Sequence, residues 1–352
     1  MCTLKEEKGI KLKMKNIDNN LYKKIFNNIK IEILNSQYSA MQSINRELIF
    51  MYWHIGNIIL ENSEWGNKFI DNLSVDLKLE FPNVKGFSIR NLKNMKKFAC
   101  EYKDFEFVQS VTAQITWTHN VLLLDKIKNP EIREWYINQT INNGWSVNLL
   151  EMQIDSKLYE RQVTSSKITN FSNTLPDTQS DLALQTMKDP YIFDFITLKG
   201  KVKELEIENA MISKIKDVLI ELGSGFAFVG NQYKLTVSNK DYFIDLLFYH
   251  LKLKCYIVVE LKAREFEPQD AGQLNFYLSA IDDLVKDEED NPSIGLLLCK
   301  TKDRFTAEYS LKDINKPIGV SEYKLFEDIP EYLQSQLPKL EDIELHIREV
   351  DE

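Results

Sequence analysis

The chain has 352 residues, of which 43% are hydrophobic and 28% are charged, a balance typical of globular domains. Its net charge is −9, but residues 327–352 hold nine acidic and two basic residues and so account for −7 of it. No stretch approaches the roughly 18 consecutive apolar residues that a membrane helix needs, so we expect no membrane partner. A nucleic-acid partner is not excluded, because local patches of charge matter more than the total.

The N-terminal residues 1–20 are rich in lysine and lack the apolar core of a signal peptide. We expect them to form a flexible basic arm. The four cysteines, Cys2, Cys100, Cys255 and Cys299, show neither metal-ligand spacing nor a disulfide framework. A reducing, cytoplasmic setting is therefore predicted.

Residues 21–160 are predicted to form a helical domain, because their apolar residues recur at helical spacing. Gly56 falls inside the first helical pattern and suits a point of close packing. Ser88 is a good N-cap for the third, basic helix. The expected helices cover residues 21–62, 64–81, 89–102, 110–127 and 130–154. A winged-helix arrangement, with a role in binding DNA or a partner, is the candidate for this domain.

A change in composition follows this domain. Residues 161–189 are rich in Ser, Thr, Asn and Asp and lack sustained periodicity, which favours a linker or an extended connection. Residues 190–330 then show the order α-β-β-β-α-β, which predicts a mixed sheet with flanking helices. Residues 331–352 form an acidic tail. The expected elements are a helix over 199–223, strands over 226–237, 241–250 and 254–262, a helix over 267–286 and a strand over 293–300.

Three charged residues interrupt the apolar strands. Asp245 lies in the middle of the second strand, while Glu260 and Lys262 lie two apart on the third and so project from one face. If these strands pair, Asp245 lies beside Glu260, and two facing carboxylates repel unless a cation sits between them. Hard oxygen ligands on a rigid sheet suit Mg²⁺. Spacing alone leaves a structural salt bridge open as the alternative.

Further polar residues extend this group. Glu208 is predicted to face inward from the preceding helix, although Glu204 or Glu206 of the same charged run could take its place. Gln273 and Tyr277 lie one turn apart on the following helix and share a face directed toward the sheet edge. The alternatives are a polar helix surface for Gln273 and core packing for Tyr277.

The longer sequence stretches are similar to a known family. The motif of the PD-(D/E)XK nucleases resembles the series Glu208, Asp245, Glu260-Leu261-Lys262 and Gln273-xxx-Tyr277. More narrowly, "ELGSGFAFVGNQYKLTV", "DYFIDLLFYHLKLKCYIVVELK" and "AGQLNFYLSAIDD" resemble the YhcG-like family of nuclease-domain proteins, and "WYINQTINNGWS" and "TLPDTQSDLA" resemble its N-terminal region and connecting segment. The resemblance covers roughly residues 28–330, with Ile244 standing where the motif's name has proline.

The resemblance implies a role for each residue of the series. It makes Asp245 and Glu260 the metal ligands and Lys262 the catalytic lysine. Glu208 becomes an outer or second-metal ligand, and the glutamine and tyrosine of the following helix become residues that support the catalytic site. It also implies a restriction-endonuclease-like fold for residues 190–330.

The basic helix is a separate candidate site for nucleic acid. Arg90, Lys93, Lys96 and Lys97 follow a turn after another helix, as in the second helix of a helix-turn-helix, whose side chains bind phosphates or enter a groove. The alternative is a solvated lysine face, which is common on surface helices.

The function expected from these features is Mg²⁺-dependent hydrolysis of phosphodiester bonds in DNA, by an endonuclease rather than an exonuclease. Mn²⁺ is expected to substitute for Mg²⁺, and no phosphate-cradling glycine-rich loop suggests a nucleotide cofactor. Cutting both strands usually needs two sites, which favours a homodimer. The alternatives are a non-catalytic DNA-binding or assembly protein that retains the fold, and an RNA-directed nuclease.

Overall fold

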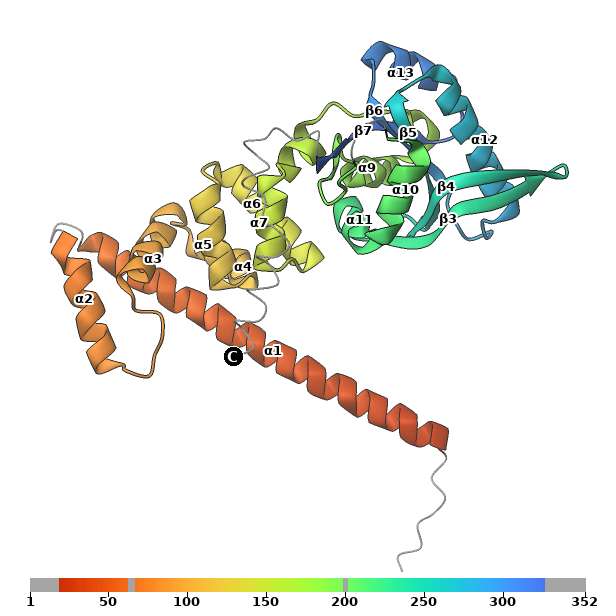
Figure 1. Ribbon diagram of the computed structural model, residues 1–352. Helices are drawn as coiled ribbons and strands as arrows, with labels where there is room; N and C mark the ends of the chain where they lie inside the picture. The colour runs from red at the N-terminus through yellow and green to blue at the C-terminus, as the bar shows by residue number, and fades with distance from the viewer. Residues whose placement is uncertain (1–18, 63–66, 199–201, 327–352) are drawn as a thin grey trace, which may run out of the picture. The chain divides into compact units, whose positions relative to one another are not determined.

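The computed structural model describes residues 19–62, 67–198 and 202–326 (Figure 1). Contacts divide the chain into two compact units, Met1–Val147 and Asn148–Glu352. The expected basic arm, apart from its last two residues, and the acidic tail lie outside the described residues. No helix of the described ranges is long and apolar enough to cross a membrane.

The first unit is helical. The described residues of this unit contain no strand, so a wing of the winged-helix type is not among them. Its elements are α1 (Asn19–Glu61), α2 (Asn67–Glu80), α3 (Ile89–Glu101), α4 (Phe105–Ser110), the 3-10 helix η2 (Thr112–Gln114), α5 (Trp117–Lys126), α6 (Pro130–Asn143) and the start of α7 (Val147–Asp155).

The packing of α1 on α3 confirms two expectations. A Cβ atom added at Gly56 would lie 2.1 Å from the backbone oxygen of Met95, so only glycine allows the two helices to approach this closely. Ser88 caps α3, because its hydroxyl accepts a hydrogen bond from the backbone N–H of Asn91 at 3.2 Å. The contact fixes the basic helix against the core of its unit.

The stretch 110–127 differs from the single helix expected there. It divides into the end of α4, η2 and α5, because polar side chains satisfy the backbone groups at the breaks. The Asn120 amide donates to the oxygens of Thr112 and Thr116 at 3.0 and 3.1 Å. His119 is a structural histidine, since its two ring nitrogens bond the Thr116 hydroxyl and the Trp145 oxygen.

The stretch 161–189, expected to be a linker, is folded against the second unit's core. Its polar residues bond the backbone, as Asn170 does to Ile314, Lys316 and Ile318, and its apolar residues, such as Met187, are buried. Composition misleads here because the polar side chains cap and pair rather than face water. The elements of this part of the chain are the π-helix η3 (Glu160–Thr164), β1 (Ile168–Thr169), α8 (Phe171–Thr174), α9 (Asp177–Thr186) and, just beyond it, β2 (Tyr191–Phe193).

A mixed sheet forms the centre of the second unit. Its strands run in the order β1-β7-β6-β5-β4-β3, with β2 also parallel to β7. The β3–β4 hairpin turns at Ser238 and Asn239, which have φ angles of 49° and 63°. The α-β-β-β-α-β order is present, and β1, β2, α13 and β7 are additions to it. The main strands are β3 (Phe226–Val237), β4 (Lys240–His250), β5 (Cys255–Glu265), β6 (Ile294–Thr301) and β7 (Ile318–Leu325).

Helices cover both faces of this sheet (Figure 1). One core joins Ile207 and Met211 of a first helix pair to Phe248 and Val259 of the strands. The other joins α12 and α13 to the opposite face, for example through Leu278. The single helix expected over 199–223 is the pair α10 and α11, separated at Lys214. These four helices are α10 (Glu204–Ser213), α11 (Ile215–Leu222), α12 (Pro268–Leu284) and α13 (Arg304–Leu311).

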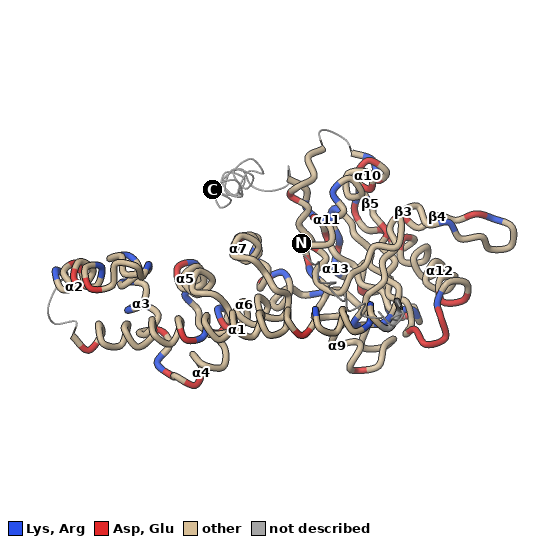
Figure 2. The backbone as a smooth tube through the Cα atoms, turned by 90° about the horizontal axis from the view of Figure 1, so that it is seen from below, with Lys and Arg blue, Asp and Glu red and all other residues tan. Residues whose placement is uncertain are grey.

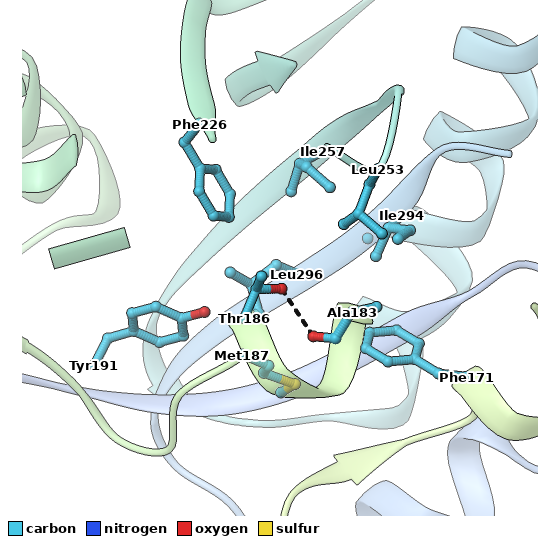
Figure 3. A pocket seen from close by; sticks show the side chains of 11 residues that line it. Phe171, Ala183, Thr186, Met187, Tyr191, Phe226, Leu253, Ile257, Ile294 and Leu296 are labelled. Carbon is cyan, nitrogen blue, oxygen red and sulfur yellow. Dashed lines mark hydrogen bonds between the residues drawn. The ribbon is translucent and has the colours of Figure 1, made fainter. Parts of the chain in front are cut away.

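A small apolar cavity of about 30 Å³ lies within the first of these cores, between α9 and the strands (Figure 3). Phe171, Met187, Ile257 and Leu296 are among the side chains that line it, and the Thr186 hydroxyl turns back to the Ala183 oxygen at 2.9 Å. No carboxylate, lysine, arginine or histidine lines this cavity. It is a packing feature and not a catalytic site.

A buried ionic cluster attaches the stretch 161–189 to α11. The Glu221 carboxylate accepts hydrogen bonds from Arg161 at 2.5 Å, from Lys188 at 3.5 Å and from the backbone N–H of Ile192 at 2.9 Å. Burial lowers the pKa of Lys188 to about 8, against the opposing effect of Glu221. The cluster therefore holds two cations in the interior through one carboxylate.

Replacing Glu221 by alanine is expected to destabilise the protein by about 3–5 kcal/mol, because it leaves two buried cations without their partner. Urea denaturation followed by circular dichroism measures the change. Asp217→Ala, on the same helix, is the control and should cost less than about 1 kcal/mol. Equal stability of the two variants would contradict the structural role of Glu221.

Candidate active site

The candidate site begins where β4 and β5 stop pairing. Their antiparallel ladder runs from His250–Cys255 to Leu246–Val259 and ends there. The next pair in register would be Asp245 and Glu260, as the sequence predicts. Instead of a backbone pair, the Asp245 carboxylate accepts the N–H of Leu261 at 2.9 Å. The side chain therefore satisfies a donor that the ladder leaves open.

The backbone on both strands of the β3–β4 hairpin is irregular at the same level. A bulge shifts the register between Phe228 and Gly230, and Gln232 has a left-handed φ of 44°. On β4, Ile244 and Leu246 pack into opposite cores, although residues two apart normally share a face. The twist at this point turns Asp245 out of the regular alternation.

Gln232 links Asp245 to α10. Its amide donates to Glu208 Oε2 at 2.6 Å and lies 3.5 Å from Asp245 Oδ1. Asn231 donates to the other oxygen of Glu208 at 3.2 Å. Glu208 is buried, as expected, and both of its oxygens have amide partners. It lies beside the two candidate ligands and is held in place through amides.

Glu260 and Lys262 lie on one face of β5 and are buried. Lys262 Nζ is 3.5 Å from Glu260 Oε2 and 4.0 Å from Glu204 Oε2, so the ammonium lies between two carboxylates. Glu204, from the first turn of α10, also accepts the backbone N–H of Ala263 at 3.2 Å. The structure thus brings Glu204 as well as Glu208 to the site, where the charged run left the choice open.

The α12 residues Gln273 and Tyr277 reach the same site. The Gln273 amide donates to Glu260 Oε2 at 3.3 Å and to the Tyr277 hydroxyl oxygen at 3.1 Å. These contacts orient one oxygen of Glu260. Its other oxygen, Oε1, is buried without a hydrogen-bond partner.

The electrostatics of the site are unfavourable without a cation. Burial raises the pKa of Glu260, and the charge of Asp245 raises it further. Burial also raises the pKa of Asp245, while the N–H of Leu261 acts in the opposite direction. For Lys262, burial acts to lower the pKa, but Glu260, Glu204 and Asp245 together raise it above its usual value. The lysine stays charged, and the two carboxylates resist being ionised together.

The residues present fit a divalent cation. Asp245 and Glu260 are hard oxygen donors close enough for the charge of one to act on the other, and the Oε1 atom of Glu260 has no hydrogen-bond partner. In the described part of the chain, no three His, Cys, Asp or Glu side chains converge into a metal cage. Two carboxylates with several waters are nevertheless the usual protein contribution to a Mg²⁺ site.

An open cleft of about 600 Å³ gives access to these groups. Asp245, Glu208 and Gln232 line it together with Glu204 and Arg264. Glu260 and Lys262 are only 1% and 7% exposed. A ligand in the cleft therefore meets the Asp245 side of the site first.

Figure 2 shows the positions of the lysine and arginine residues along α3. Only some of them are available to bind a ligand. Arg90 and Lys93 are exposed. Lys97 instead donates to Asp125 and to the Leu124 oxygen, each at 2.8 Å, so its charge is paired. Lys96 is half-buried. Arg90 and Lys93 are thus the residues of this group best placed to contact an anion.

The sequence pattern does not reveal Gln232 or Asn231. Their position depends on a bulge and a left-handed backbone residue within the hairpin. Gly230, which interrupts an otherwise regular strand pattern, is the one signal that indicates an irregularity there.

The sheet order and the converging Asp245, Glu260 and Lys262 define the class of PD-(D/E)XK nuclease domains. Residues 184–338 match the family described as "YhcG PDDEXK nuclease domain". Residues 28–161 match the family described as "DUF1016 N-terminal domain". The "Putative nuclease YhcG" of Escherichia coli (strain K12) is 30% identical over 340 residues, which cover 86% of this chain and 90% of that protein. The chain belongs to the YhcG family of PD-(D/E)XK nuclease-domain proteins.

Two solved structures show weaker likeness. A repair endonuclease from Pyrococcus abyssi is 16% identical over 37% of this chain and 49% of its own, with a TM-score of 0.25. The EndoMS–dsDNA2 complex is 17% identical over 39% of this chain and 50% of its own, with a TM-score of 0.27. This chain thus covers about half of each, and TM-scores this low add nothing to the assignment.

Glu260→Gln is expected to raise the melting temperature of the metal-free protein, because it removes one of two repelling carboxylates. It should also abolish the further rise that Mg²⁺ causes in the unchanged protein. Thermal unfolding with EDTA and with increasing Mg²⁺ measures both effects. Asp241→Asn, which changes an exposed carboxylate on β4 outside the site, is the control. A full Mg²⁺ response in both Glu260→Gln and Asp245→Asn would rule out this cation site.

Proposed function

We propose that this protein is an Mg²⁺-dependent endonuclease that hydrolyses phosphodiester bonds in DNA. The observation that supports this most directly is the meeting of Asp245, Glu260 and a charged Lys262 where β4 and β5 separate beside an open cleft. A buried structural salt bridge alone would not need a second carboxylate or a polar atom without a partner.

Asp245 and Glu260 are the residues that would hold the metal, through their carboxylate oxygens. When bound there, Mg²⁺ supplies positive charge beside the scissile phosphate and makes water more acidic. Mn²⁺, which accepts the same oxygen donors, is expected to substitute. No nucleotide cofactor enters the proposal.

Lys262 acts as a fixed positive charge. Its raised pKa keeps the ammonium protonated at neutral pH, so it donates hydrogen bonds and does not accept a proton. A phosphate oxygen that gains charge during in-line attack is stabilised by such a donor. Glu204 and Glu260 hold the ammonium in position from two sides.

The other polar residues position the carboxylates. Gln273, supported by Tyr277, fixes Oε2 of Glu260. Gln232 fixes Asp245 and joins it to Glu208. Glu208 is thereby an outer residue of the metal site. Positioning of this kind matters because an error of about 1 Å in a catalytic group costs on the order of 100-fold in rate.

The choice of DNA and of internal cutting rests on the family resemblance and on the open form of the cleft. An open cleft accepts the middle of a strand and does not require an end. The exposed Arg90 and Lys93 of α3 are proposed to contact phosphates of the substrate. A cytoplasmic location is part of the proposal and agrees with Cys100, Cys255 and Cys299 being free thiols.

Cleavage of a supercoiled plasmid with Mg²⁺ tests the function. Asp245→Asn and Lys262→Ala should each reduce the rate at least about 100-fold, because each removes a group that stabilises charge in the transition state. Asp241→Asn and the exposed Lys324→Ala are matched controls and should cut normally.

The substrates separate the alternatives. Linear and nicked plasmid products identify an endonuclease, and resistance of the closed circle with degradation of linear DNA would instead indicate an exonuclease. Faster cutting of single-stranded RNA would overturn the DNA assignment. No cutting of any substrate, with DNA binding unchanged in both site variants, would favour a non-catalytic binding protein.

Arg90→Ala and Lys93→Ala should each weaken DNA binding to a similar degree for all sequences, because they remove phosphate contacts. The slope of log K against log salt concentration should fall by about 1 per residue. Fluorescence anisotropy at several salt concentrations measures it. Lys97→Ala, whose charge is paired with Asp125, should leave the slope unchanged. An equal loss from Lys97→Ala would contradict this surface.

A further inference from the structure

The N-terminal half of α1 is an apolar helix without cover in its own unit. Every residue from Tyr22 to Ile44 is exposed. The C-terminal half, in contrast, buries Ile49, Tyr52 and Ile59 against α3 and its neighbours. Figure 1 shows the exposed half extending beyond the other helices of the first unit. An isolated stretch of this length is marginal as a helix in water and is normally stabilised by packing of an apolar face.

The apolar residues of this half form two seams along the helix. The first seam recurs at intervals of three, four and seven residues and consists of Tyr22, Phe26, Ile29, Ile33, Ala40 and Ile44. The second seam begins with Ile31, Leu34, Tyr38 and Met41. Both have the spacing of residues that interlock between neighbouring helices.

The second seam continues without a break into the core of the unit. Its alternating steps of three and four residues pass through Asn45 to Leu48, Tyr52, Ile55 and Ile59. In that part the seam already packs against other helices, with Leu48 and Ile55 partly buried against the cluster that contains Tyr52 and Ile59. The exposed half thus repeats a pattern that the same helix uses for helix packing.

The exposed apolar area is large enough for a stable interface. Ten large side chains between Tyr22 and Ile44 are each 48–70% exposed. At roughly 100 Å² each they present on the order of 1,000 Å², whereas apolar patches on monomers reach about 300–600 Å². A standard interface buries about 800 Å² on each partner.

We propose that residues 22–44 of α1 form a self-association surface that packs against the same segment of other copies of this chain. Homo-oligomers use the same patch on each subunit, and a seam of Ile, Leu, Phe and Met packs well against itself. The charged residues of this segment are Lys23, Lys24, Lys30 and Glu32, a net charge of +2 that opposes association only weakly.

The two seams lie on different sides of the helix, so one neighbouring helix covers only one of them. A bundle in which each helix touches two others covers both. The expected assembly is therefore a four-helix bundle of four copies, with a dimer as its half-assembled form. This inference does not depend on the nuclease chemistry, because no residue of segment 22–44 belongs to the catalytic site.

The mass of the full-length protein in solution tests the proposal, measured by light scattering during size-exclusion chromatography at several concentrations. The unchanged chain should have the mass of a tetramer or a dimer. Ile29→Glu with Ile33→Glu disrupts the first seam, and Leu34→Glu with Met41→Glu disrupts the second. All four sites are exposed in a single copy, so the fold of each variant should survive, which circular dichroism verifies.

A tetramer should fall to a dimer in either double variant, and a dimer should dissociate in the double variant of the seam that it uses. The chain with all four changes combined should be a monomer. Leu79→Glu on α2, an equally exposed apolar site outside the segment, should leave the mass unchanged. The proposal would be overturned if the unchanged chain were a monomer at concentrations of tens of micromolar, at which stable assemblies form. The proposal would also be overturned if the chain with all four changes kept the oligomeric mass of the unchanged chain.

Discussion

The candidate site of the second unit is built around one hydrogen bond, from the backbone N–H of Leu261 to the Asp245 carboxylate. Two antiparallel strands would normally pair through their backbones at this level. Because a side chain takes the donor instead, the ladder between β4 and β5 ends at Leu246–Val259, and Asp245 is held by its carboxylate. The sheet cores on both sides keep the strands together up to this point, so the opening is local and its geometry is fixed.

The rest of the site follows from how four carboxylates, those of Asp245, Glu260, Glu204 and Glu208, share this opening with one ammonium. Lys262 balances Glu260 and Glu204, while Asp245 is left with amide partners only. The arrangement carries more negative than positive charge inside a low-dielectric region, which is unfavourable unless a cation completes it. Under the proposed function, the stability of the metal-free protein and the binding of a cation make opposite demands on Asp245 and Glu260.

Much of this site follows from sequence because strands have a period of two. Glu260 and Lys262 had to share a face, and Asp245 had to lie level with Glu260 once the strands paired. Gln232 could not be predicted, since its position requires a left-handed residue and a bulge that no periodicity reveals. The stretch 161–189 misleads for a related reason: Asn170 and its polar neighbours look solvated in sequence but serve as backbone partners. Periodicity therefore locates regular elements, whereas side chains that replace backbone partners become visible only in three dimensions.

The β3–β4 hairpin is packed over most of its length and exposed at its tip. Beyond the bulge at Gly230, Asp245 lies between the paired residues Ile244 and Leu246, and further along Leu235 is buried in the core that contains α12. The turn around Ser238 and Asn239 is exposed. Residues can be gained or lost there in pairs without reversing which side chains face inward, since a shift by two preserves the faces. The tip of this hairpin can therefore lengthen or shorten by pairs of residues without disturbing Asp245 or either core.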